Sequence, residues 1–176
     1  MSHTTTVKTV QIKSVSALKK MAINLKNKGL NVELVENAVP RMYYKDQIAR
    51  TLKKSSAPMQ YHSNVEECDF VLVVKDSYYD IGFLKNVDGE YVPLFDNFSF
   101  PSPYHMGDIH RKPLIEITGV TAPKSTPKKE IINYSIGKVL QEYSLCATVE
   151  ACEEAGYTIT KSIVDEHGSI HIEVEV

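Results

Sequence analysis

The residues best suited to chemistry lie in one proline-rich stretch, residues 100–113, with the sequence FPSPYHMGDIHRKP. His105, Asp108 and His110 carry imidazole and carboxylate groups, and a catalytic zinc needs about three such ligands from the protein. The spacing His-x-x-Asp-x-His matches no established metal-binding pattern, and a loop would have to direct all three side chains to one point. The alternative is a loop stiffened by prolines, with histidines that are exposed or hydrogen-bonded to its own backbone.

The same stretch and its N-terminal flank are rich in aromatic side chains. Phe98, Phe100 and Tyr104 precede His105, and Arg111 follows. Aromatic residues and arginine are enriched at protein–protein contacts, so these five residues form the predicted binding site for a protein partner. The competing interpretation is that the aromatic residues cover an open face of the sheet.

Other catalytic patterns are missing from the sequence. It contains no GxSxG nucleophile motif and no glycine-rich phosphate loop, and its eight glycines are scattered. Cys68, Cys146 and Cys152 form no CxxC pair, which favours three reduced and mostly buried thiols over a disulfide framework or a zinc site. The residues therefore favour a non-enzymatic protein without a cofactor.

The charge is distributed unevenly along the chain. Residues 1–56 carry a balance of +8 and residues 57–176 a balance of −10, which gives the net charge of −2. A basic first third would attract an anionic partner such as a nucleic acid, or its lysines would pair with acids elsewhere in the fold. The segment has no aromatic residues interleaved with its basic ones and no known nucleic-acid motif, which favours the second interpretation.

The order of helices and strands follows from the spacing of apolar residues and from turn signals. The sequence opens with a β-α-β unit, in which Ser14 or Ser16 starts the helix and Gly29 ends it. Asp88-Gly89 is a strong hairpin turn, and Pro93 indicates that the second strand of this hairpin lies near a sheet edge. The remaining predicted elements are a short basic helix at 46–54, a central strand at 69–76, a strand at 113–120, a long helix from Lys128 to Glu154 and a final hairpin at 157–176.

These elements predict an α+β fold. We expect a mostly antiparallel sheet with a β-α-β start, a central hairpin, a long C-terminal helix and a final β-hairpin, with the helices on one face. Residues 1–176 are expected to form one domain, with insertions at about 37–66 and 96–128. No apolar run approaches the roughly 18 residues that span a bilayer, and the first residues lack the apolar core of a signal peptide. We therefore expect a cytoplasmic protein without a membrane partner.

Two stretches of the sequence resemble a known family. The start MSHTTTVKT, followed by QIKSVSALKKMAINLKNKG, and the end QEYSLCATVEACEEAGYTITKSIVDEHGSIHIEVEV are similar to the domain of unknown function 1257 family, and DIGFLKNVDGEYVPLFD is similar to its middle. Members include a conserved hypothetical chloroplast and cyanobacterial reading frame and phage proteins. The resemblance covers about half of the chain and transfers no catalytic residue. Its genes often lie near AAA+ ATPases, which implies an accessory role.

Three functions follow from these observations. The first is a non-enzymatic accessory or adaptor protein that binds a protein partner, either an AAA+ ATPase or a second copy of itself as a homodimer. The second is a small metal-dependent enzyme using the loop of His105, Asp108 and His110. The third is a nucleic-acid binder that uses the basic N-terminal third.

Overall fold

The computed structural model describes residues 4–6, 11–42, 67–96, 110–122, 124–126, 131–164 and 170–175. Its elements are β1 (Thr4–Thr6), α1 (Val15–Asn27), β2 (Val32–Ala38), β3 (Cys68–Val74), β4 (Ile81–Lys85), β5 (Tyr91–Asp96), α3 (Leu114–Thr118), the 3₁₀ helix η2 (Ile131–Ile136), α4 (Gly137–Glu154), β6 (Thr158–Val164) and β7 (Ile170–Glu175). The predicted helix at 46–54 and the turn at 166–168 lie outside the described residues.

The predicted α+β class is confirmed. Five strands form one sheet in the order β1-β5-β4-β3-β2, and every neighbouring pair is antiparallel. β6 and β7 form a separate two-stranded sheet. It follows from the pairing that β1 and β2 run in the same direction at opposite edges, so the β-α-β unit crosses three intervening strands.

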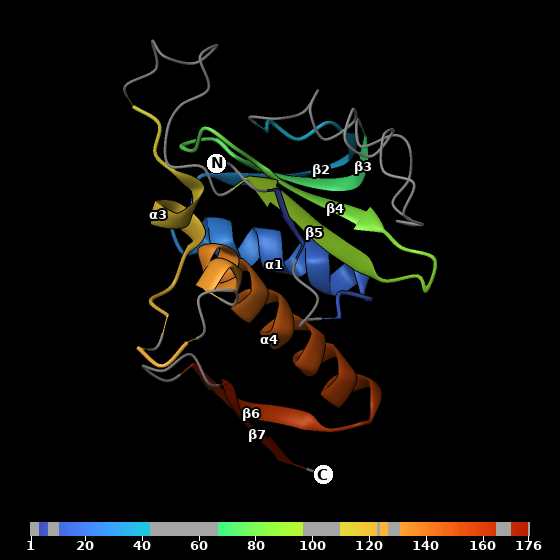
Figure 1. Ribbon diagram of the computed structural model, residues 1–176. Helices are drawn as coiled ribbons and strands as arrows, with labels where there is room; N and C mark the ends of the chain where they lie inside the picture. Colours follow the sequence, from blue (N-terminus) through green and yellow to red (C-terminus); the bar gives the residue numbers. More distant parts are fainter. Residues whose placement is uncertain are drawn as a thin grey trace.

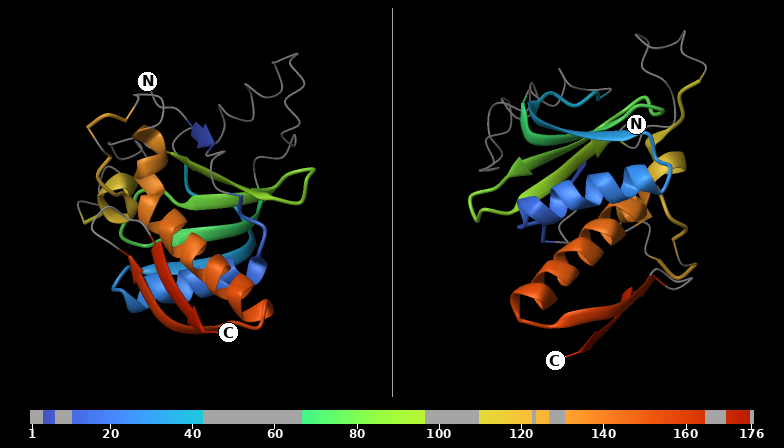
Figure 2. Two further views of the ribbon diagram at one scale, coloured as in Figure 1. Left: turned by 90° about the horizontal axis from the view of Figure 1, so that it is seen from below. Right: turned by 180° about the vertical axis from the view of Figure 1, so that it is seen from behind.

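The molecule is built in three layers (Figure 1). α1 and α4 lie on one face of the five-stranded sheet, and the β6–β7 hairpin lies on the far side of α4 (Figures 1 and 2). The main core lies between the sheet and the helices, where the side chains of Leu18, Met21, Phe83 and Phe95 are almost fully buried.

The ends of α1 form as the sequence predicts. Ser14 is the N-cap residue, and its hydroxyl accepts a hydrogen bond from the backbone N–H of Ala17 at 3.0 Å. Gly29 has a φ of +91°, a conformation that glycine adopts without strain. The residues of α1 that face the core are Ala17, Leu18, Met21, Ala22 and Leu25.

Polar contacts fix α1 against α4. Glu142 of α4 is 5% exposed and accepts hydrogen bonds from the side chains of Asn24, at 2.8 Å, and Lys28. At the other end of α1, the N-cap residue Ser14 donates to Glu150 at 2.7 Å. Because a buried carboxylate is costly without partners, these bonds define how the two helices are placed along each other.

The predicted strand at 113–120 is wrong, because this segment contains α3. Its β-branched residues favour a strand, but tertiary contacts override that preference. Leu114 is 1% exposed, and the hydroxyl of Thr118 donates to the carbonyls of Leu114 at 3.0 Å and Ser135 at 2.9 Å. A single helical turn satisfies both contacts.

The long C-terminal helix is confirmed, but its predicted start is wrong. α4 begins at Gly137 and is preceded by six residues of 3₁₀ helix, while residues 128–130 lie outside the described part. Gly137 packs so closely that a Cβ atom there would lie 2.3 Å from a methyl group of Val120. At the other end Gly156 has a φ of +85°, as expected of a residue that ends a helix.

The C-terminal hairpin is confirmed as well. Ile159 pairs with Val174 and Ser162 with Ile172 on one side of the ribbon, and Lys161 pairs with Glu173 on the other. Its cover is incomplete, because Val174 is 41% exposed. The hairpin rests on α4 without joining the main sheet.

β5 lies one strand in from the sheet edge, so the position inferred from Pro93 is close to what is observed. β1 pairs only with residues 94–96 of β5, and Ile12 pairs with Tyr91. Pro93 lies between these two contacts.

Candidate protein-binding surface

Most of the predicted site lies outside the described residues. This holds for Phe98, Phe100, Tyr104, His105 and Asp108. His110 is exposed and Arg111 is half-buried at the C-terminal end of the loop. Among the described residues, no group of three or more histidine, cysteine, aspartate or glutamate side chains is placed to hold a metal ion.

The end of this loop is attached to the connection between β3 and β4. The backbone N–H of Lys112 donates to the carbonyl of Asp76 at 2.8 Å, and the N–H of Tyr78 donates to the carbonyl of Lys112 at 3.2 Å. Ser77 and Lys112 thereby form an isolated parallel bridge. The structure thus fixes where the candidate loop rejoins the core.

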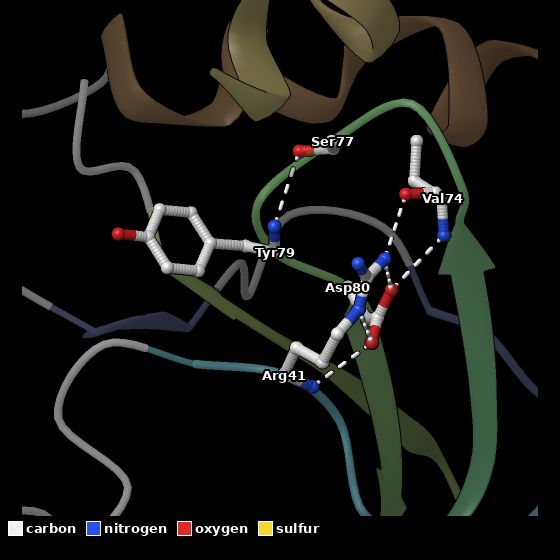
Figure 3. A network of polar contacts seen from close by, with 5 residues as sticks. All are labelled: Arg41, Val74, Ser77, Tyr79 and Asp80. Atoms are coloured by element: carbon white, nitrogen blue, oxygen red, sulfur yellow. Dashed lines mark hydrogen bonds and ion pairs between the residues drawn. The ribbon is translucent and has the colours of Figure 1, made fainter. Parts of the chain in front are cut away.

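A buried ion pair holds the same connection from the other side (Figure 3). Asp80, which is 2% exposed, accepts from the Arg41 guanidinium at 2.6 and 2.9 Å and from the backbone N–H of Val74 at 3.0 Å. Arg41 also donates to the carbonyl of Val74 at 2.8 Å. Both carboxylate oxygens of Asp80 accept hydrogen bonds from the protein, so we assign the Arg41–Asp80 pair a structural role.

Cys68 and Cys146 do not have the environment of an activated nucleophile. Burial, and to a smaller extent the charge of Asp69, raises the pKa of the Cys68 thiol to about 11. Burial and then the nearby Glu142 carboxylate raise the pKa of Cys146. A cysteine nucleophile needs a depressed pKa, so neither residue has the environment that catalysis requires. Both are free and buried, as predicted.

Most of the basic residues of the first third that the structure describes are paired with acids. Five of them form ion pairs in the described part of the chain, and four of the five pair with acids beyond residue 56. These pairs are Lys13–Glu90, Lys19–Glu36, Lys20–Glu150, Lys28–Glu142 and Arg41–Asp80. Within the described residues, part of the positive charge of the first third is thus paired with acids of the later part of the chain, as one of the two interpretations of the charge distribution predicts.

The aromatic residues described between positions 70 and 95 belong to the interior. Tyr78, Tyr79 and Tyr91 are 9%, 1% and 7% exposed. Tyr91 packs edge-on against Phe70, with ring centroids 5.4 Å apart. These residues therefore do not form an exposed aromatic surface, and the two interpretations of Phe98, Phe100 and Tyr104 stay predictions.

An open strand edge is the first feature that can receive a partner. β2 pairs with β3 on one side, and within the described residues no strand pairs with its other side. An unpaired edge presents backbone N–H and C=O groups to which another extended chain can bond. Figure 2 shows β2 at the end of the sheet, beside α1.

The hydrogen-bond pattern shows which residues of β2 face outward. Asn31 accepts from the N–H of Lys75, so odd-numbered residues bond to β3. Val74, which is opposite Val32, directs its backbone groups to Asp80 and Arg41 instead. The N–H and C=O groups of Leu34 and Glu36 therefore point to the open edge.

A hollow of about 350 Å³ lies beside this edge. Its floor includes Ala22 of α1 and Val32 and Leu34 of β2. The wall formed by α1 consists of Lys19, Ile23 and Lys26, which share one helix face. Ile23 is 60% exposed, so an apolar side chain is available at the centre of the wall. We call this feature the α1–β2 groove.

The charges along the α1–β2 groove are only partly paired. Lys19 bonds to Glu36 at 2.7 Å, and Glu33 bonds to Lys75 at 2.8 Å, which holds the pKa of Glu33 below its ordinary value. In the described part of the chain Lys26 makes no ion pair, although its charge also lowers the pKa of Glu33. Among the described residues, Lys26 at one end of the groove therefore carries a positive charge that is not held in an ion pair.

The sequence contained one signal for this surface that pattern reasoning missed. Ile23 interrupts the polar face of α1 between Lys19 and Lys26, where an apolar residue has no role in the core. The status of β2 as an edge strand carried no local signal, because it depends on the order of strands in the sheet.

Comparison with known proteins found no matching family model, no matching curated protein and no matching solved structure. The similarity of the chain's ends to the domain of unknown function 1257 family therefore stays a prediction. No helix in the described part of the chain is both long and apolar enough to cross a lipid bilayer.

Proposed function

We propose that this protein is a non-enzymatic accessory protein that binds a protein partner, and that the α1–β2 groove receives an extended segment of that partner. The observation that carries the proposal is the open edge of β2 beside an apolar hollow. Main-chain hydrogen bonds to an edge provide affinity, and pockets for alternate side chains provide specificity.

The geometry supports this mode over a small-molecule site. The hollow is lined on one side by a strand whose Leu34 and Glu36 backbone groups point outward. A strand added there would place every second side chain over Ala22 and Ile23, because side chains alternate between the faces of a sheet. This arrangement selects an apolar residue at the centre of the bound segment.

Site-specific photo-crosslinking in the native cell tests the proposal. A benzophenone amino acid in place of Ile23 should give a cross-link to an extended segment of a protein. The same amino acid in place of Val87, which is 69% exposed in the β4–β5 turn, should give none. Equal labelling from both positions would contradict the proposal.

A backbone variant provides the second arm. Leu34→Pro removes an outward N–H while leaving the β2–β3 bonds in place, so the chain should fold and the cross-link from position 23 should disappear. Far-UV circular dichroism checks that the variant is folded. A folded Leu34→Pro variant that still gives the cross-link would show that the edge is not used.

A further inference from the structure

We infer that the segment received by the α1–β2 groove is β2 of a second copy of this chain, paired antiparallel about a twofold axis centred on Leu34. The two five-stranded sheets then form one continuous sheet of ten strands. This inference rests on the proposed function and names its partner. The argument uses the backbone pattern of β2, its charges and the shape of the groove.

The backbone pattern restricts the possible registers. Outward-facing groups belong to even-numbered residues, so an even residue of one copy must lie opposite an even residue of the other. The N–H of Val32 already bonds to the carbonyl of Leu30 at 2.9 Å, so the pairing uses the N–H groups of Leu34 and Glu36. In a symmetric antiparallel pair the twofold axis therefore passes through a residue and not between two residues. Within β2 the candidates are positions 33, 34, 35 and 36.

Charge reduces these four registers to two. An axis at Glu33 or Glu36 places two carboxylates directly opposite each other, which is destabilising. An axis at Val35 places Glu36 diagonally beside its symmetry mate, and an axis at Leu34 does the same to Glu33, but each of these glutamates is bonded to a lysine of its own chain. The axis at Leu34 opposes Leu34 to Leu34 and Glu36 to Val32.

The position of Lys26 decides between the two remaining registers. Lys26 acts on Glu33, the neighbour of Val32, while Lys19 bonds to Glu36, so Lys26 and Val32 belong to the same end of the groove. The axis at Leu34 places Glu36 of the second copy opposite Val32, near Lys26, whereas the axis at Val35 places it opposite Leu34. With the axis at Leu34, each Glu36 is placed between Lys19 of its own chain and Lys26 of the other. The symmetry produces this contact twice.

The apolar parts of the groove are matched in the same arrangement. Leu34 of the second copy has its side chain on the face of α1, since residues paired directly across strands share a face. It enters the hollow between Ala22 and Ile23. This contact covers Ile23, which is otherwise 60% exposed.

The edge carries little of the usual protection against such pairing. Edge strands that remain single commonly carry charged residues, lysine above all, or proline or a bulge, and the two glutamates of β2 are each bonded to a lysine of the same chain. β2 reads VELVENA, contains neither lysine nor proline, and keeps a regular register with β3. Its positive φ at Asn37, +48°, lies outside the five residues from Val32 to Glu36 that the proposed pairing uses.

A cysteine scan of the full-length protein tests the register. The variants are Glu33→Cys, Leu34→Cys and Val35→Cys, each compared with the wild-type chain as background for the three native thiols. Directly opposed, hydrogen-bonded residues have Cα atoms about 5.5 Å apart, within the usual disulfide range. Under mild oxidation Leu34→Cys should form the intermolecular disulfide fastest.

Charge exchange provides an independent arm, measured by analytical ultracentrifugation. Lys26→Glu and Glu36→Lys should each weaken self-association by about tenfold or more, because like charges then meet twice. A mixture of the two variants should restore association, since both contacts are attractive in the mixed dimer. Lys124→Glu, an equal charge change at an exposed position far along the chain, should have no effect.

The outcomes are distinguishable. A wild-type chain that is monomeric at all concentrations overturns the homodimer, while the photo-crosslink from position 23 to another protein would leave the proposed function intact. A dimer that cross-links best at position 33 or 35, or that ignores both charge variants, also overturns the inference. A dimer that links at 34 and is restored by mixing supports it.

Discussion

At the scale of single residues, Asp80 connects two segments of the chain through one buried carboxylate. Its carboxylate joins the segment after β2, through Arg41, to the end of β3, through Val74. We expect Asp80→Ala to lower the free energy of unfolding by about 3–5 kcal/mol, because it leaves a largely buried guanidinium and a buried N–H without an acceptor.

Urea denaturation measures this effect, and Asp76→Ala is the matched control. Asp76 lies in the same connection but is exposed and accepts one side-chain bond, from Asn31 at 3.0 Å. Its loss should cost less than about 1 kcal/mol. A similar loss of unfolding free energy in both variants would show that the Arg41–Asp80 pair contributes no more to stability than an exposed hydrogen bond.

Glu150 links stability to pH. Burial alone would raise its pKa, but hydrogen bonds from Ser14, Ser16 and Lys20 outweigh burial and bring the pKa below its ordinary value. A depressed carboxyl pKa contributes stability above the unfolded value, and this contribution is lost as the pH falls through the folded value.

We therefore expect the unfolding free energy of the wild-type protein to fall more steeply below about pH 4.5 than that of Glu150→Gln. Glutamine keeps an acceptor oxygen for Ser14 and Ser16 but does not titrate. Denaturation curves between pH 3 and pH 7 give the comparison. Parallel pH profiles would mean that the Glu150 contacts do not form.

At the scale of elements, the start of α4 depends on the close approach of Gly137 and Val120. Alanine favours a helix over glycine by about 1 kcal/mol, so Gly137→Ala would stabilise α4 if there were space. The added Cβ instead meets Val120 at 2.3 Å, and we expect a net loss of about 1–3 kcal/mol.

A second substitution separates overlap from other causes. Val120→Ala removes the methyl groups that the new Cβ would meet, so the double variant should be more stable than the sum of the two single effects predicts. Thermal unfolding of the four proteins gives this comparison. If the effects of the two single substitutions on stability simply add, overlap with Val120 is not the cause of the loss.

The elements also show what the sequence could predict. α1, with Ser14 and Gly29 at its ends, and the C-terminal hairpin were predictable because their signals are local. The segment 113–120 was not, since α3 forms to bury Leu114 and to bond Thr118 to Ser135, a residue 17 positions later. The α1–β2 groove was missed for the same reason: it exists only once strand order is known.

At the scale of the whole molecule, stability should be distributed unevenly. β3 and β4 have neighbours on both sides and pack on the main core, whereas β6 and β7 form a two-stranded ribbon supported by α4. Two-stranded ribbons are marginally stable alone. We expect amides of β6 and β7 to exchange with opening free energies at least about 2 kcal/mol below those of β3 and β4.

Hydrogen exchange followed by mass spectrometry or NMR measures this difference. Peptides from α4 serve as an internal reference, because α4 belongs to the main core and also contacts the β6–β7 ribbon. Equal protection in the ribbon and the central strands would show that the ribbon is part of one cooperative unit with the sheet.

The path of the chain has a consequence for the order in which the protein folds during synthesis. β1 pairs with residues 94–96 and α1 packs on α4, which begins at Gly137, so β2 is the partner of these two elements that lies close in the sequence, through its contacts with α1. The β3–β4–β5 meander, in contrast, closes over short turns. Local pairings form before distant ones, so we expect the meander to form first. The packing of α1 against α4 should follow only when the last third of the chain has been synthesised.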